Sequence, residues 1–258
     1  MNIAFRIGRL SFAASGVFSP QVELQVRSVS RQAIQEGWLT ARVVACDKSL
    51  IKARGPIWHK KQRKRKQIPK KLRGIDRESK WGVSPYHGWV QGYAAHLVVN
   101  ATPGEVLFPL VIQGTTANVN ELDVFASHIL YLPEATRKCL IDLGYDDDWT
   151  FRKLLHRHVM PIIPIHTCAS SSEIRKQVRQ AYRRQLNRKL YKRRMSTIER
   201  SFARKKHLFE TNGQTWFYGA RQNRTFLAMA AFAIQLLTLY NLRHGRPAEC
   251  IKVILDSL

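Results

Sequence analysis

Three acidic side chains, Asp47, Asp142 and Glu199, are the first candidates for chemistry in this sequence. Asp47 ends the apolar run 41–46, and Asp142 ends a second apolar run, 138–141, shortly before a glycine that lets the chain turn. Glu199 lies later, in a segment with helical periodicity. Because hard divalent ions such as Mg²⁺ prefer carboxylate oxygens, the three acids are a candidate ligand set.

Each acid also has a purely structural alternative. An isolated aspartate at the end of a strand can equally cap the following turn or helix. The acidic run 146–148 follows Asp142, and it favours turn and N-cap contacts at the next helix. A lone Glu199 would face solvent and pair with Arg200 or Lys206. Only the three acids taken together favour a functional site.

The surrounding motifs occur in a definite order. Asp47 is followed by Asp-x-Gly-Tyr-Asp over 142–146, and then by Ile-Glu-Arg-x-Phe over 198–202, with Lys206 beyond. This ordered set resembles the catalytic domain of the DDE transposases of bacterial insertion sequences. The resemblance implies a ribonuclease-H-like core that acts on DNA.

Segments after the first acid add to the resemblance. Residues 55–61, 81–84 and 88–93 are similar to the stretch that follows the first catalytic aspartate in that family. The similarity runs from about Leu39 to about Leu242.

One spacing departs from the family pattern. Members often carry Tyr-x-x-Arg with three residues between the arginine and the glutamate, whereas Tyr191-x-x-Arg194 leaves four before Glu199. One extra helical residue rotates a side chain by about 100°. Lys206, seven residues after Glu199, still fits the pattern.

The resemblance also implies a metal cofactor. Asp47 would bridge two Mg²⁺ or Mn²⁺ ions, and Asp142 and Glu199 would each hold one of them. Two such ions, roughly 3.5 to 4 Å apart, activate an attacking oxygen and stabilise the departing one in phosphodiester chemistry.

Composition points to a polyanionic partner. The chain has 258 residues, a globular hydrophobic content of 45% and a net charge of +25, which favours nucleic acid over a membrane or an acidic protein. Its four scattered cysteines indicate a reducing cytoplasm, and neither a zinc pattern nor a phosphate-binding glycine loop is present.

Two basic segments are the expected DNA contacts. The block 60–73 repels itself too strongly to pack, so it is expected to be a mobile insertion loop at about 55–80. A single helix is expected over 173–194, with a narrow apolar stripe and many cations. The residues expected to bind nucleic acid are Lys60, Lys61, Arg63, Lys64, Arg65, Lys66, Arg183, Arg184, Arg194, Arg200 and Lys206.

The expected fold is α/β, with a ribonuclease-H-like mixed sheet of three antiparallel strands and then parallel strands, flanked by helices. Strands are expected at 39–46, 92–100, 105–113, 138–141 and 159–165, and helices at 21–37, 122–132, 147–158 and 225–240. Pro161 and Pro164 confine the last strand to an edge.

Three segments are expected along the chain. Residues 1–38 would be an N-terminal remnant of a DNA-recognition region, 39–242 the catalytic domain and 243–258 a C-terminal tail. The apolar helix 225–240 is shorter than the roughly 20 residues that span a bilayer, so we expect a buried helix that covers the sheet. The resemblance implies a cytoplasmic, nucleoid-associated bacterial protein.

The expected function is metal-dependent DNA cleavage and strand transfer on element ends and target DNA, by a homodimer assembled on the DNA. Two alternatives remain open. One is a related nuclease or junction resolvase that cuts without joining, and the other is a truncated, non-catalytic DNA-binding remnant.

Overall fold

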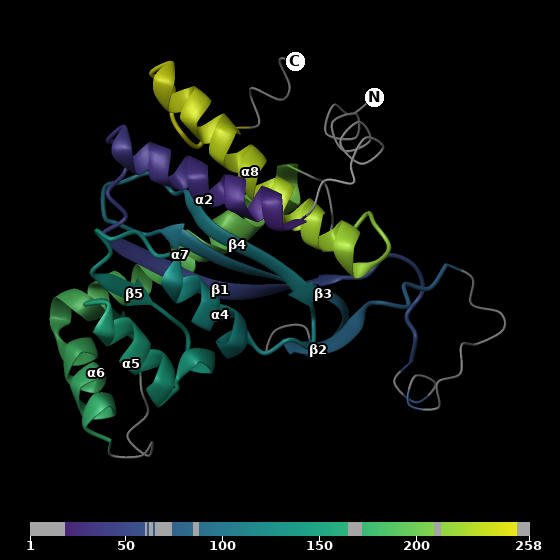
Figure 1. Ribbon diagram of the computed structural model, residues 1–258, viewed down its shortest axis with the longest axis horizontal. Coiled ribbons are helices and arrows are strands. Elements are labelled where there is room, and N and C mark those ends of the chain that lie inside the picture. The colour runs from purple at the N-terminus through teal and green to yellow at the C-terminus, as the bar shows by residue number, and fades with distance from the viewer. Residues whose placement is uncertain are drawn as a thin grey trace.

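The computed structural model describes residues 19–59, 61, 64, 74–84, 88–164, 172–208 and 213–251 (Figure 1). The helices are α2 (Ser19–Gln35), α4 (Glu121–Leu130), the 3-10 helix η1 (Leu143–Tyr145), α5 (Asp148–His156), α6 (Glu173–Arg183), α7 (Gln185–Leu208) and α8 (Ala220–Arg243). The strands are β1 (Val43–Lys52), β2 (Lys80–Ser84), β3 (Gly88–Asn100), β4 (Pro109–Thr116), β5 (Lys138–Leu140) and β6 (Met160–Ile162).

The strands form one mixed sheet in the order β2-β3-β1-β5-β6, with β4 also paired to β3. Strands β1, β2 and β4 are antiparallel to β3, whereas β5 and β6 extend the sheet in parallel. This confirms the expected mixed sheet flanked by helices, compatible with a ribonuclease-H-like fold. Strand β6 lies at an edge, as its Pro161 requires.

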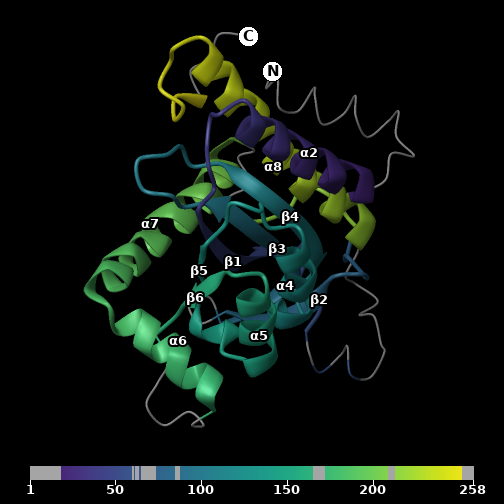
Figure 2. The same cartoon turned by 60° about the vertical axis from the view of Figure 1, so that its left-hand side comes forward.

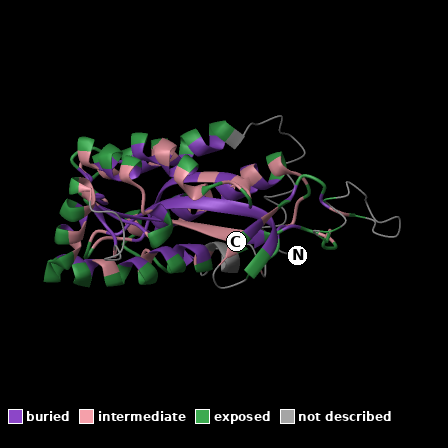
Figure 3. Ribbon diagram, turned by 90° about the horizontal axis from the view of Figure 1, so that it is seen from below, coloured by how far each residue is buried: buried purple, intermediate pink, exposed green. Residues whose placement is uncertain are grey.

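Alternating side chains of β1 build two cores, one on each face of the sheet. Val44 and Cys46 pack with Phe125 of α4 and with α5 and η1, whereas Val43 and Ala45 pack with α7, α8 and the start of α2. The helices turn their exposed residues away from the sheet (Figure 3).

Strand β1 differs from its prediction at both ends. It begins at Val43, because Ala41 has a left-handed backbone (φ 51°) that interrupts an extended run from residue 39. It continues past Asp47 to Lys52, because the long strand β3 pairs with it as far as Gly92. Asp47 therefore lies within a strand and not at its end.

The helix expected over 173–194 is in fact two helices. Arg184 caps α6 with an extended backbone (φ −61°, ψ 130°), and α7 starts at the next residue. The Asn187 side chain donates to the Ala181 carbonyl oxygen at 2.7 Å and accepts from Lys138 Nζ at 2.8 Å, so it stabilises the break and ties it to β5. The two helices follow one another along the side of the molecule that carries β5 and β6 (Figure 2).

Helix α8 lies beside α2 over strand β4, and the expected burial of this apolar helix is confirmed (Figure 1). By length and composition α8 could cross a membrane, but 56% of its apolar window is buried in this fold. Its Gln235 is fully buried and donates to the carbonyl oxygens of Val26 and Pro109 at 2.9 and 2.8 Å. Arg224 of α8 forms a two-pronged ion pair with Glu23 of α2, at 2.8 and 2.7 Å.

Candidate active site

The parallel register of β1 and β5 brings two of the three candidate acids together. Ala45 of β1 pairs with Leu140 of β5, and Asp47 and Asp142 each lie two residues further along. The backbone of Asp142 remains extended (φ −83°, ψ 169°). Because side chains alternate along extended backbone, both aspartates lie on the face that carries Ala45 and Leu140, which α7 covers.

The two carboxylates are held in the same way. Asp47 Oδ1 accepts from the Lys48 backbone N–H, and Asp142 Oδ1 accepts from the Leu143 backbone N–H, both at 2.7 Å. Their other oxygens meet one guanidinium: Arg194 Nη1 lies 3.1 Å from Asp47 Oδ2, and Arg194 Nη2 lies 3.4 Å from Asp142 Oδ2. Both free oxygens therefore point at the same cation.

Burial shapes the charges in this pair. It raises the pKa of Asp47 to about 6, although the guanidinium of Arg194 opposes the shift and Asp142 adds to it. Burial disfavours the charged form of Arg194, but the two aspartates outweigh this and raise the pKa of Arg194. The arginine side chain is 10% exposed, against 25% for Asp47 and 48% for Asp142, so the pair opens to solvent on the Asp142 side.

Glu199 is not brought to the aspartates. It is exposed on α7, and in the described part of the chain it is not grouped with Asp47 and Asp142 as a metal site would require. Five helical residues rotate a side chain by about 140°, so Glu199 cannot share the direction of Arg194. Ile198, which is fully buried, occupies the neighbouring position that does face the sheet.

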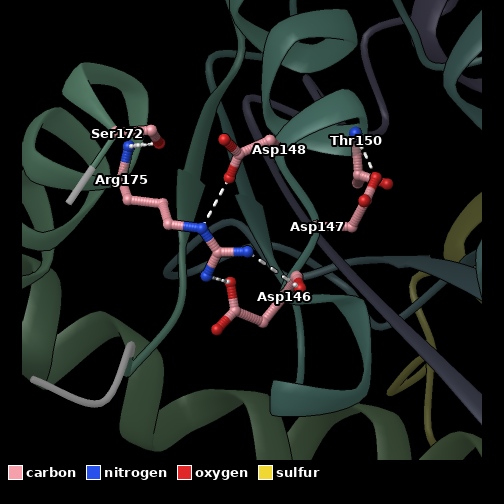
Figure 4. A network of polar contacts seen from close by, with 6 residues as sticks. All are labelled: Asp146, Asp147, Asp148, Thr150, Ser172 and Arg175. Carbon is pink, nitrogen blue, oxygen red and sulfur yellow. Dashed lines mark hydrogen bonds and ion pairs between the residues drawn. The ribbon is translucent and has the colours of Figure 1, made fainter. Parts of the chain in front are cut away.

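The acidic run after Asp142 makes the structural contacts that the sequence allows. Asp147 caps α5 by accepting from the Thr150 N–H at 2.8 Å. Asp146 and Asp148 each pair with Arg175 of α6 at 2.5 Å (Figure 4). These contacts hold α6 against α5. The acids of the run are thus engaged elsewhere, and Asp142 is the one that faces Asp47.

A comparison with known protein families agrees with the mixed sheet and the aspartate pair. The family model described as the transposase DDE domain matches residues 38–242, which is most of the chain. The chain belongs to the DDE transposase family. No curated protein and no solved structure matches the chain significantly.

Only some of the predicted DNA-binding cations of the transposase are described. Lys61, Lys64, Arg183, Arg184 and Arg200 are exposed. Lys60, Arg63, Arg65 and Lys66 lie outside the described residues, as does the side chain of Lys206. Arg200 lies 3.6 Å from Glu249, and Arg194 is buried against the aspartates.

Sequence reasoning missed one carboxylate near the transposase's aspartate pair. Glu121, in the first turn of α4, packs so closely on Gly144 that a Cβ there would lie 1.9 Å from Glu121 Oε1. Its charge also acts on Asp47, while its own pKa is raised by burial and by Asp142. The only sequence signal is an acid at the start of a helix, which dipole complementarity explains equally well.

The aspartate pair fits one part of a divalent metal site. Two hard oxygen atoms converge on a single cation, as they would on Mg²⁺, which keeps several waters as further ligands. However, no three His, Cys, Asp or Glu side chains in the described part of the chain are grouped to hold a metal. DDE transposases generally depend on divalent metal, and the aspartate pair supplies two of the ligands that such a site needs.

Proposed function

We propose that this transposase cleaves DNA and transfers the cut strand to a new site during insertion-sequence transposition. The observation that carries the proposal is the convergence of Asp47 Oδ2 and Asp142 Oδ2 on one cation, in a chain of the DDE family. The proposed cofactor is a pair of Mg²⁺ or Mn²⁺ ions held by Asp47, Asp142 and Glu199.

The residues of the chain prepare the site for this chemistry. Backbone N–H groups of Lys48 and Leu143 fix one oxygen of each aspartate, which leaves the other oxygen oriented before any ligand arrives. Bound divalent ions would supply activation of the attacking oxygen and stabilisation of the departing one. Glu199 would join only after α7 turns or changes register, because its side chain faces away from the pair.

The exposed cations of α6 and α7 would hold the DNA backbone. Arg183, Arg184 and Arg200 are solvent-facing, and the chain as a whole carries +25 charges. Binding that releases counterions should weaken steeply as salt rises. Fluorescence anisotropy with a labelled duplex measures this between about 50 and 200 mM salt, an interval over which several phosphate contacts cost orders of magnitude in affinity. Binding that does not change with salt contradicts the electrostatic part of the proposal.

The central test compares four isosteric variants. Asp47→Asn, Asp142→Asn and Glu199→Gln should each abolish cleavage and joining while DNA binding persists, since each removes a metal-binding charge but not volume. Asp146→Asn is the matched control, because Asp146 pairs with Arg175 of α6, whereas Asp47 and Asp142 pair with Arg194. Cleavage of uncut and pre-cut element ends, with a gel-shift beside it, gives the readout. An inactive Asp146→Asn together with an active Asp142→Asn would reassign the second ligand.

Metal dependence is tested separately. Mg²⁺ or Mn²⁺ should support nicking, whereas Ca²⁺ should bind with little turnover because its longer, looser coordination misplaces the reacting oxygens. Activity that persists in a chelator excludes the two-ion mechanism.

One observation favours a second candidate function. The exposure of Glu199 is what a DNA-binding protein without catalysis would show. Full loss of activity in the two aspartate variants alone would instead indicate a two-carboxylate site. If all four variants behave like the parent, the non-catalytic protein is favoured. A joining assay separates the transposase from a nuclease or resolvase. For the active form we propose a homodimer assembled on element ends and target DNA in the bacterial cytoplasm.

A further inference from the structure

The guanidinium of Arg194 lies where the two aspartates would hold a shared cation. Its Nη1 and Nη2 atoms contact Asp47 Oδ2 and Asp142 Oδ2, the two oxygens that the backbone leaves free. A divalent ion that is bound by both oxygens must occupy the same space. Arginine and metal therefore cannot both bind there.

The fold holds Arg194 in this position. Leu190, Arg194 and Ile198 are spaced by four residues, so they lie on the same face of α7, and all three are buried. The Arg194 side chain is 10% exposed, and its Nε has no hydrogen-bond partner among the described residues. The centroid of the Tyr191 ring, one turn earlier on α7, lies 5.8 Å from the guanidinium carbon. The arginine is thus a built-in partner of the aspartates and not a mobile surface cation.

The charge balance explains why this partner is needed without metal. Two carboxylates of like charge that face one point repel each other, and burial makes the repulsion stronger than in water. One guanidinium neutralises part of this charge: it donates a hydrogen bond to Asp47 and forms an ion pair with Asp142. A divalent ion supplies twice the charge but must first displace the arginine.

We propose that Arg194 is an internal counter-cation that keeps divalent ions out of the aspartate pair until nucleic acid draws its guanidinium away. The inference rests on the proposed function, since it assumes that Asp47 and Asp142 are metal ligands. A phosphate of the DNA backbone is the competing anion, because guanidinium pairs with phosphate through two parallel hydrogen bonds. The side chain can leave toward the Asp142 side, where the pair is open to solvent. Metal loading and DNA binding then strengthen each other by the same factor.

The test measures Mn²⁺ binding and does not depend on activity. Electron paramagnetic resonance counts free Mn²⁺ during titration of the metal-free full chain, without DNA. Arg194→Gln should bind Mn²⁺ at least about tenfold more tightly than the parent, because it removes a positive charge next to the ion. Arg193→Gln is the matched control: Arg193 is exposed on the same helix, so the same loss of charge should change the affinity less than about twofold.

A second variant covers the case in which Arg194→Gln fails to fold. Arg194→Lys keeps the charge but offers a single ammonium group that cannot span both acids as the two arms of the guanidinium do, so it should bind Mn²⁺ more tightly than the parent. Where Arg194→Gln folds, the affinity of the lysine variant should stay below that of the glutamine variant. Adding a duplex oligonucleotide should tighten Mn²⁺ binding in the parent far more than in Arg194→Gln. Circular dichroism confirms that each variant is folded.

The outcomes separate this inference from the proposed function. Equal, measurable Mn²⁺ affinity in the parent and in both Arg194 variants overturns the counter-cation and leaves the metal site intact. Loss of binding when Asp47→Asn is combined with Arg194→Gln supports the aspartates as the ligands. Absence of Mn²⁺ binding in every protein, with and without DNA, overturns both proposals.

Discussion

Asp47 should destabilise the metal-free fold at neutral pH, and Asp47→Asn should reverse this. Burial raises the pKa of Asp47 from 3.8 to about 6, so the folded protein prefers the protonated acid. The carboxyl group therefore favours folding below pH 3.8, and this contribution is lost as pH rises through 6. Asparagine resembles the protonated acid and avoids the loss. Asp142 still pairs with Arg194 in the variant, so the guanidinium keeps a counter-charge.

The size of the effect follows from the pKa shift. A shift of about two pH units corresponds to about 3 kcal/mol at most, since one unit equals about 1.4 kcal/mol. The Asp47 side chain is 25% exposed, and solvent screening reduces this to about 2 kcal/mol. For a chain of this size, the midpoint of thermal unfolding should then rise by about 4–8 °C.

Paired denaturation curves measure the gain. Urea unfolding of parent and Asp47→Asn, both free of metal, should differ by about 2 kcal/mol at pH 7.5 and by much less at pH 4, where the acid is protonated in the folded chain and about half protonated in the unfolded one. Asp146→Asn serves as the control and should show no comparable gain, because it loses an ion pair to Arg175. A variant that is less stable than the parent at pH 7.5, or a gain independent of pH, refutes the reasoning.

Three further outcomes concern the fold around the site. Gly92→Ala should lower the free energy of unfolding by about 2 kcal/mol or more in urea, since a Cβ there would lie 1.9 Å from the Ile51 carbonyl oxygen, and an unchanged midpoint would contradict this. Glu23→Gln should lower the free energy of unfolding by about 2 kcal/mol, because it breaks the ion pair with Arg224. The loss is smaller than for a fully buried pair, since the Arg224 side chain is 35% exposed. A loss no larger than that for an exposed glutamate elsewhere would argue against the pair. Burial lowers the pKa of His128 to about 3, so its contribution to stability is present above pH 6.5 and falls as acid protonates the unfolded chain. His128→Leu should therefore remove about 2 kcal/mol of the stability that the parent loses between pH 6.5 and 5. Unfolding followed by circular dichroism at both pH values measures this, and equal acid sensitivity of variant and parent would count against it.

The part of the site that periodicity governs could be predicted from the sequence. Apolar runs that stop at Asp47 and Asp142 predicted that each acid follows a buried stretch of strand. The parallel register of β1 and β5 then brings both acids to Arg194. The capping role of the run 146–148 was also predictable, because helix N-termini favour acids. The extent of β1 was not, since strand length depends on the partner strand β3, which lies far along the chain.

The direction of the α7 side chains was harder to foresee. The extra residue between Arg194 and Glu199 implied that the two cannot face the same way, but not which of them turns toward the sheet. The spacing of Leu190, Arg194 and Ile198 decides it. Leu190 and Ile198 are eight residues apart and face the sheet, so Arg194, midway between them, faces it too. The break at Arg184 was not predictable either, because the break is stabilised by a hydrogen bond between Asn187 and Lys138 of the distant strand β5.

The short strand β5 leaves the placement of Asp142 weakly protected against sequence change. Cys139, Leu140 and Ile141 are all apolar and fully buried, so both faces of the strand would tolerate a shift by one residue. Such an insertion or deletion would turn Asp142 to the α4 face with little loss of apolar packing. Folding and quality control would accept the product, and only the failure of chemistry would reveal the error.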